Sequence, residues 1–361
     1  MPAPHRLEPL AFHSLAGWTE DDHQAALGAF RRTGETLAAA KDSPRPAQPP
    51  PPELISIAHA ALDQASAAGR DARRFFETRF RPFRVTPTAG GGFLTGYYQP
   101  CVPASPVETE QFRWPILKRP ADLVSFAPGP APAGFPEGVT GARRLSDGSL
   151  VPYPDRAAIE AERRDAIAWV RDAAEAFLIQ VQGSAELEFP DGRRARLAYD
   201  GRNGLPYTSI GKILIETGEI AESDMALRSL KAWLRRDCAR GLALMRRNRS
   251  FVFFRLVEDY DPSLGPVAGA GAPLTPLRSI AVDRAIWAYG LPFWIDAELP
   301  WADETPRPFR RLMIAQDTGS AIVGAARADL YFGAGEAAGE RAGAIRHRGS
   351  FVVLLPQGGS A

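Results

Sequence analysis

The stretch from Leu312 to Glu336 constrains the fold of this chain more than any other. It holds an apolar run that ends at Asp317, a glycine-containing turn, and a second apolar run, Leu330-Tyr-Phe, directly after Asp329. Short apolar runs bounded by turn residues are typical of buried β-strands. The stretch therefore predicts two strands of a β-domain, each with an aspartate at or near one end.

These two aspartates have unlike surroundings. Asp329 stands against apolar and aromatic residues, where loss of hydration raises a carboxyl pKa because the charged form is penalised. Asp317 leads into Thr318-Gly-Ser, whose N–H and hydroxyl groups favour an ionised carboxylate. Two acids in such environments are typical of acid-assisted bond cleavage. On the residues alone a structural role is favoured, in which Asp317 caps a turn and Asp329 starts the element that follows.

Composition excludes several classes of function. A chain of 361 residues predicts two domains. Its 43 basic and 42 acidic residues nearly cancel, which argues against nucleic acid or an anionic membrane surface as an electrostatic partner. The 5 histidines are scattered, so we expect no metal site and no cofactor. Cys101 and Cys238 are expected to be free thiols unless the fold brings them together.

The N-terminal part of the chain favours helices. A capping-box spacing at Thr19–Asp22 opens an Ala-rich helix to about Ala40, and helical patterns recur over 53–68 and 71–80. The Pro-rich run 43–52 is typical of an extended linker or loop. Aromatic residues at helical spacing predict a core face made of Phe75, Phe76 and Phe80.

The middle of the chain carries the clearest β pattern. Phe177–Gly201 alternates apolar residues on both sides of a Pro190-Asp-Gly turn, which predicts a hairpin. In the first of these strands Gln180 and Gln182 would share one face, suited either to sugar hydroxyls or simply to solvent.

Helical patterns flank this hairpin at 155–172, with Trp169 in the core, and at 207–248. A strongly apolar strand over 251–258 is expected to return the chain to the first domain. Near residue 97 a strand with adjacent tyrosines, Tyr97 and Tyr98, predicts one ring in the core and the other free to stack on a sugar.

Three segments together resemble the MltA family of lytic transglycosylases. They are Gly96-Tyr-Tyr-Gln-Pro, the stretch 179–212 with Val181-Gln-Gly-Ser at its start, and the block from Arg278 onward. That block is similar to the "3D" domain, which is named for three aspartates, here Asp283, Asp317 and Asp329. The resemblance covers most of the chain from about residue 93 to residue 356.

The resemblance implies a mainly β fold with N-terminal helices. A double-psi β-barrel domain would be built from residues 1–101 and 247–361, and a second β-barrel domain would be inserted at 102–246. A groove between two such domains suits a long polymer.

The implied activity is that of a peptidoglycan lytic exotransglycosylase, which cleaves the β-1,4 bond between N-acetylmuramic acid and N-acetylglucosamine and leaves 1,6-anhydromuramic ends. By resemblance, Asp329 is the catalytic acid and base and Asp317 its orienting or electrostatic support. Asp283 has a similar or a structural role. The implied partner is the peptidoglycan glycan strand, bound by a monomer. The implied substrate-binding residues are Asp283, Tyr97, Tyr98, Gln182, Gly183, Ser184, Tyr199 and Asn203.

Two alternatives to this activity stay open from the residues. One is an inverting glycosidase with Asp329 as acid and Asp317 or Asp283 as base. The other is a non-catalytic glycan-binding module. Family members are exported, so we expect a periplasmic location with outer-membrane association. The N-terminus lacks the basic start and apolar core of a signal peptide and any lipoprotein cysteine, which predicts either a removed leader or a start placed too late.

Overall fold

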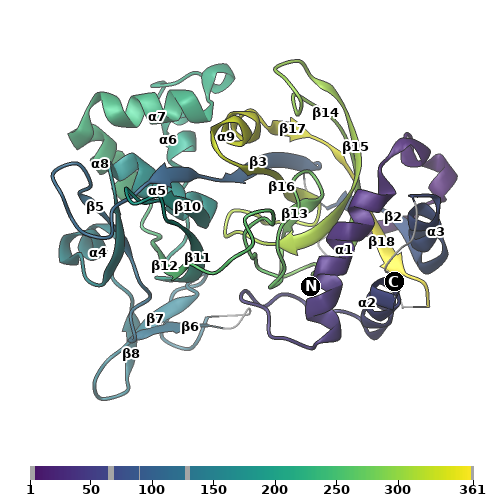
Figure 1. Cartoon of the computed structure of the whole chain (residues 1–361), viewed down its shortest axis with the longest axis horizontal. Coiled ribbons are helices and arrows are strands. Elements are labelled where there is room, and N and C mark those ends of the chain that lie inside the picture. The colour runs from purple at the N-terminus through teal and green to yellow at the C-terminus, as the bar shows by residue number, and fades with distance from the viewer. Residues whose placement is uncertain (1–4, 64–68, 89, 127–130, 359–361) are drawn as a thin grey trace. The chain divides into compact units, whose positions relative to one another are not determined.

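The computed structural model describes residues 5–63, 69–88, 90–126 and 131–358, which form a mostly β structure with several helices (Figure 1). The chain divides into two compact units. The first combines Met1–Tyr98, Ser263–Gly333 and Arg341–Ala361, and the second combines Gln99–Pro262 and Ala334–Glu340. None of the helices in the described ranges has the length and apolar character that crossing a membrane requires.

A nine-stranded sheet forms the centre of the first unit, in the order β1-β2-β18-β14-β15-β13-β16-β3-β17 (Figure 1). Its strands are β1 (His5–Pro9), β2 (Phe80–Pro87), β3 (Phe93–Gln99), β13 (Ser279–Val282), β14 (Pro292–Leu299), β15 (Arg307–Asp317), β16 (Arg327–Ala334), β17 (Arg346–Arg348) and β18 (Ser350–Pro356). β13 is parallel to β15 and antiparallel to β16. The two strands predicted from the stretch 312–336 are confirmed as β15 and β16.

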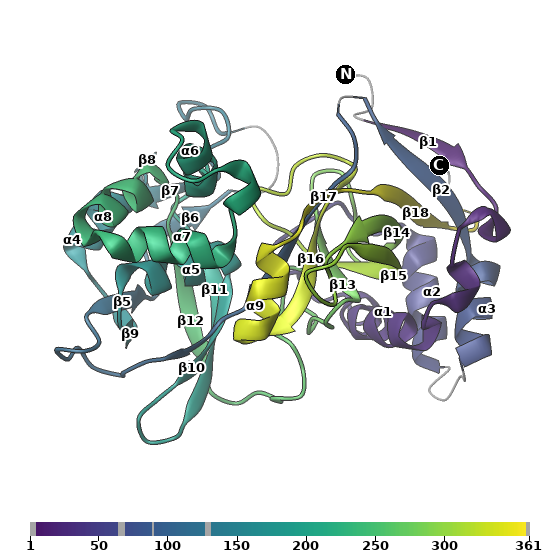
Figure 2. The ribbon, with the colours of Figure 1, turned by 90° about the horizontal axis from the view of Figure 1, so that it is seen from above.

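Three helices pack beside this sheet: α1 (His23–Ala38), α2 (Pro52–Asp63) and α3 (Gly69–Arg79) (Figure 2). α1 contacts β15, α2 contacts β18 and α3 contacts β2. The predicted capping box at Thr19 is wrong, because a 3-10 turn occupies Trp18–Glu20. The helix begins one turn later, where the Asp22 carboxylate accepts a hydrogen bond from the Ala25 N–H at 3.0 Å.

An aromatic cluster joins these helices to the sheet. Phe30 of α1 contacts Phe75, Phe76 and Phe80, with ring centroids 5.9 to 6.0 Å apart and mostly tilted or edge-on. The predicted core face of three phenylalanines is confirmed, since none of them is more than 2% exposed.

A buried ion pair connects the segment before α1 to the sheet. The Arg278 guanidinium donates to both oxygens of Asp21 at 2.8 Å, and only 6% and 4% of these side chains are exposed. The Asp21 carboxylate also accepts from the Leu312 N–H of β15 at 2.9 Å. Asp21 thereby ties the start of β13 and the middle of β15 together.

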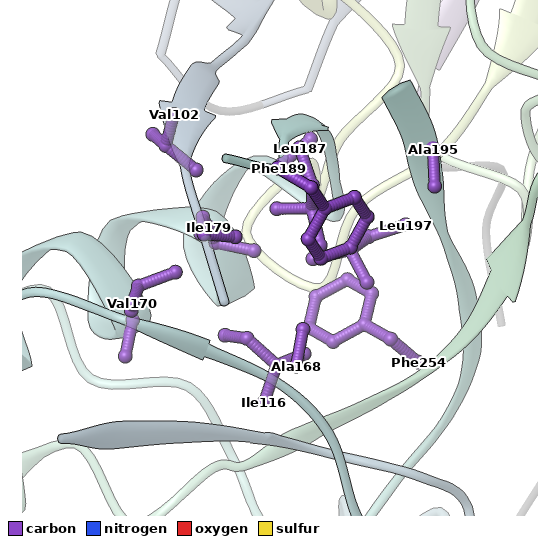
Figure 3. Packing of buried hydrophobic residues seen from close by; sticks show 13 residues of the cluster. Val102, Ile116, Ala168, Val170, Ile179, Leu187, Phe189, Ala195, Leu197 and Phe254 are labelled. Carbon is purple, nitrogen blue, oxygen red and sulfur yellow. The ribbon is translucent and has the colours of Figure 1, made fainter. Parts of the chain in front are cut away.

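The second unit contains smaller sheets and helices. Its strands are β4 (Cys101–Pro103), β5 (Trp114–Leu117), β6 (Leu123–Ser125), β7 (Gly141–Arg144), β8 (Leu150–Pro152), β9 (Ala166–Val170), β10 (Ser184–Glu188), β11 (Arg194–Arg202) and β12 (Val252–Val257). Its longer helices are α4 (Arg156–Glu162), α5 (Ala173–Gln182), α6 (Ile210–Glu216), α7 (Leu227–Arg236) and α8 (Cys238–Arg247), and the chain from 334 to 340 contributes most of α9 (Glu336–Gly343). Figure 3 shows side chains of these strands and of α5 converging on one apolar core.

The predicted hairpin is confirmed only from Ser184 onward, where β10 pairs with β11. The residues before it, including Gln180 and Gln182, belong to α5, so the expectation that both amides share one strand face is wrong. Ile179 shows why the pattern misled, because it enters the apolar core from a helix (Figure 3). Short apolar segments do not distinguish a buried helix from a strand.

Two further expectations for the second unit need correction. The region 155–172 splits into α4 and β9, and Trp169 on β9 is half-buried. The strand predicted to return the chain to the first domain is β12, which pairs with β11 inside the second unit. Cys101 and Cys238 are both exposed free thiols, as expected.

Candidate active site

Strand register brings two of the three aspartates to opposite sides of one small residue. Ala281 of β13 pairs with Asp317 of β15 on one side and with Asp329 of β16 on the other. Neighbouring strands lie about 4.8 Å apart, so the two aspartate backbones are about 10 Å apart. The β13–β15 register shifts between Ile280 and Ala281, and the charge of Asp317 acts on the carboxyl of Asp329 across Ala281.

Asp329 lies in an environment that raises the pKa of its carboxyl. Burial raises the pKa of its carboxyl, while the Arg327 guanidinium and a hydrogen bond from the Thr95 hydroxyl to Oδ1 lower that pKa, and the charge of Asp317 raises it again. The raised value is the net result. The residue is half-buried. A half-buried acid with a raised pKa is a candidate proton donor.

Asp317 is surrounded by hydrogen-bond donors and positive charge instead. Its Oδ1 accepts from the Gly269 N–H at 3.0 Å, and the Arg45 guanidinium lies 3.7 Å from the same oxygen. A side chain at position 269 would not fit, because a Cβ there would come within 2.6 Å of the Tyr289 hydroxyl. Arg45 belongs to the segment 43–52, which was predicted as a linker or loop, so this segment packs beside Asp317. The Tyr289 hydroxyl also donates to the Arg45 carbonyl at 2.9 Å.

Replacing Asp317 by Asn is expected to leave measurable activity. The amide keeps the shape but loses the charge that Arg45 and Gly269 accommodate, so we expect kcat/KM for glycan cleavage to fall about 10- to 100-fold, the worth of hydrogen bonds to a charged group. Initial rates on purified peptidoglycan measure this. Asp303→Asn is the matched control, because Asp303 is an exposed partner of Arg307 in the β14–β15 loop. Loss as complete as for an Asp329 variant would contradict the supporting role of Asp317.

Asp283 holds a loop in place. Its Oδ1 accepts from the Ala285 N–H at 2.9 Å and its Oδ2 accepts from the Gly324 N–H at 2.7 Å. The Thr318 hydroxyl donates to the Val282 carbonyl beside it at 2.9 Å. These bonds fix the loop between Asp317 and Asp329 against the end of β13, and they favour the structural role that the sequence left open.

Both tyrosines of β3 are buried, so neither ring is free to stack on a sugar in this conformation. Tyr97 packs against Tyr331 with ring centroids 5.3 Å apart. Burial, followed by the charges of Asp317 and Asp329, raises the pKa of the Tyr97 hydroxyl well above its ordinary value. Tyr97 therefore lies close to both carboxylates and stays protonated at physiological pH.

The other predicted binding residues lie in the second unit. Gly183 ends α5 with φ of 77°, and its N–H donates to the Ile179 carbonyl. Ser184 pairs with Ala198 of β11, next to Tyr199, so these residues and Gln182 gather at one end of the β10–β11 pair.

Asn203 has no exposed surface, and its side chain binds the backbone of Pro154, Leu205, Arg249 and Phe251. Because the residue is fully buried and its side-chain amide already binds backbone groups, we infer loop organisation rather than sugar binding for Asn203.

Thr95, Arg45 and Gly269 contact the two carboxylates, and Arg327 is linked to Asp329 through Thr95, but none of the four was identified from the sequence. Thr95 adjoins the Gly96-Tyr-Tyr-Gln-Pro motif, and Arg327 lies two residues before Asp329 on the same strand, where alternate side chains share a face. Both signals were present in the sequence. Arg45 approaches from a segment remote in sequence, for which no local pattern gives a signal.

Two segments of the chain match known protein families. Residues 93–255 match the model of the MltA specific insert domain, and residues 278–355 match that of the 3D domain. A membrane-bound lytic murein transglycosylase from Agrobacterium tumefaciens is 36% identical, with a TM-score of 0.87, and the alignment covers 97% of this chain and 98% of that one. The chain belongs to the MltA family.

Other members are similar over different lengths. Membrane-bound lytic murein transglycosylase A of Escherichia coli K12 is 34% identical over 269 residues, which are 72% of this chain and 65% of that protein. The chain thus spans less than two thirds of the length of this curated relative. A crystal structure of the Escherichia coli MltA with bound chitohexaose is 25% identical with a TM-score of 0.65, over 97% of this chain and 91% of that one.

Proposed function

We propose that this MltA-family chain is a lytic transglycosylase that cleaves the β-1,4 bond between N-acetylmuramic acid and N-acetylglucosamine in peptidoglycan. The observation that carries the proposal is the carboxyl of Asp329, whose pKa burial raises, within the matched 3D domain. The lytic transglycosylases among the relatives, and the relative crystallised with chitohexaose, support a glycan substrate.

The reaction needs one acid that later acts as a base. Protonated Asp329 donates its proton to the glycosidic oxygen as the bond from that oxygen to C1 of muramic acid breaks. The 6-hydroxyl of the same sugar then attacks C1 and returns its proton to the Asp329 carboxylate, which closes a 1,6-anhydro ring. Intramolecular attack benefits from a high effective molarity, so neither external water nor a second essential carboxylate is required.

Asp317 has the role of electrostatic support in this scheme. A nearby carboxylate stabilises the positive charge that develops on the sugar ring. Oδ1 of Asp317 is already engaged by the Gly269 N–H and the Arg45 guanidinium, which favours a fixed, supporting carboxylate over a base that activates water. The inverting-glycosidase alternative therefore has weaker support.

We also propose that the first unit is a double-psi β-barrel catalytic domain and that the second is the family's inserted β-domain. The proximity of β17 to β14, which are separated in the strand order, and the parallel pairing of β13 with β15 support a closed arrangement. The contacts divide the chain at 98/99 and 262/263 rather than at the expected 101/102 and 246/247, and they add 334–340 to the second unit.

We propose that the protein acts as a monomer on glycan strands in the periplasm, in association with the outer membrane. The support is the designation of its relatives as membrane-bound murein enzymes. For sugar contacts in the second unit we retain Gln182, Gly183, Ser184 and Tyr199, which gather at one end of β10 and β11. Near the carboxylates we retain Tyr97 as a wall of the site, and Tyr98 of the same strand stays a candidate for substrate binding.

Digestion of purified murein sacculi tests the activity. The expected result is release of muropeptides that end in 1,6-anhydromuramic acid, each lighter by one water than the hydrolysis product. Reducing ends in place of anhydro ends would replace the proposal with the glycosidase alternative. Binding without any released fragment would favour the glycan-binding module.

A further inference from the structure

Arg327 reaches Asp329 through a relay of two hydrogen bonds. Its Nη2 donates to the Thr95 hydroxyl oxygen at 2.7 Å, and the Thr95 hydroxyl in turn donates to Oδ1 of Asp329. A guanidinium has donors only, so the Thr95 oxygen must accept from it. The single hydroxyl hydrogen of Thr95 is then left for Asp329.

The Arg327 side chain is itself held in place. Its Nη1 donates to the Ala328 carbonyl, and its guanidinium lies over the Phe93 ring at 5.5 Å from the centroid. Burial lowers the pKa of Arg327, while the charge of Asp329 raises it. An arginine remains charged under these conditions, so a fixed cation stands beside the acid.

The two oxygens of Asp329 are consequently unequal. Oδ1 receives the Thr95 hydrogen, whereas no residue in the described ranges hydrogen-bonds Oδ2. A neutral carboxyl in this setting carries its proton on the oxygen that does not already accept a hydrogen bond.

We propose that Arg327 is a positioning residue for Asp329. By fixing the direction of the Thr95 hydroxyl it commits Oδ1 as an acceptor and keeps the transferable proton on Oδ2. The inference rests on the proposed function, because it assumes that Asp329 transfers a proton. The charge of Arg327 also limits how far burial raises the pKa of Asp329. Asp329 can therefore serve as a base after the bond is cleaved.

Three substitutions test the relay, with Arg311→Gln as the matched control. Arg311 is also a half-buried arginine of the first unit that lies over an aromatic ring, Trp301, at 4.3 Å, but it makes no contact with the carboxylates. In Arg327→Gln the expected fall in kcat/KM is about tenfold, as for loss of one charged hydrogen bond. The alkaline limb of the pH profile should move to higher pH, because a group that lowers the pKa of Asp329 has been removed.

Thr95→Ser should keep both kcat and the alkaline limb close to those of the parent, because it retains the hydroxyl. Thr95→Val should lower kcat more than it changes KM. A purely structural role for Arg327 predicts a lower rate with an unmoved alkaline limb, and equal effects of Ser and Val at position 95. Either of these results would overturn the proposal.

Titration of the Asp329 carboxyl by carbon-13 NMR separates this inference from the proposed function. The resonance is assigned by its loss in Asp329→Asn, and the expected midpoint is higher in Arg327→Gln than in the parent or in Arg311→Gln. If the parent cleaves no peptidoglycan, the proposed function fails while the titration still decides the role of Arg327. An unchanged midpoint in folded Arg327→Gln would refute the relay.

Discussion

Asp329→Asn is expected to abolish fragment release from murein sacculi while glycan binding persists. The amide occupies the same space and still accepts a hydrogen bond from Thr95, but it has no acidic proton to give to the glycosidic oxygen. Loss of a positioned general acid and base should lower kcat by about a thousandfold or more. Initial rates measure the first effect, and co-sedimentation with sacculi measures the second.

The pH dependence of the stability of Asp329→Asn, compared with that of the parent, tests whether the pKa of Asp329 is raised in the folded protein. A carboxyl whose folded-state pKa is raised makes the folded protein less stable as pH rises from its unfolded pKa through its folded pKa, because the unfolded chain loses its proton first. Asn does not titrate, so Asp329→Asn should gain stability relative to the parent as pH rises through that window. Melting temperatures at several pH values also establish that the variant folds. Activity of Asp329→Asn comparable to that of Asp303→Asn would remove Asp329 from the reaction.

Asp21→Ala is expected to be the most destabilising of the substitutions considered. It leaves the nearly buried Arg278 guanidinium without its carboxylate and the Leu312 N–H without an acceptor. Breaking a buried pair by removing one partner costs about 3–5 kcal/mol in the free energy of unfolding. Arg278 directly precedes β13 and Leu312 lies within β15, the strand that ends at Asp317. We therefore expect Asp21→Ala to displace the Asp317 carboxylate as well.

Denaturant unfolding of the parent and two variants measures this loss. The control is Asp296→Ala, which removes the half-exposed partner of Arg310 at 3.1 Å in the same sheet. Surface pairs of this kind contribute about 0–1 kcal/mol. Equal unfolding free energies for Asp21→Ala and Asp296→Ala would show that the Asp21 pair does not anchor the sheet.

The sequence predicted the strands that carry the site more accurately than the helix of the second unit. β15 and β16 are short apolar runs, and the turn residues that flank them favour strands over a buried helix. α5 was taken for a strand because Ile179 and its neighbours are apolar in nearly unbroken succession. That succession arises because α5 is buried on several sides, which erases helical periodicity.

The chemistry of the site was predictable only where it depends on residues that are neighbours in the sequence. The apolar neighbours of Asp329 gave the correct direction for its pKa. The bonds that tune it come from Thr95, more than 200 residues away in the chain. Likewise the charge beside Asp317 comes from Arg45, in a proline-rich segment whose composition indicates only an extended backbone. Pairings between strands and loops far apart in sequence have no signature in either segment alone.

The central claim is that one carboxyl, Asp329, transfers both protons while the sugar supplies its own nucleophile. Digestion of sacculi in heavy-oxygen water tests this most directly. The account predicts 1,6-anhydromuramic ends without any heavy oxygen at C1. One heavy oxygen at C1 of each new end would contradict it, because water would then be the nucleophile.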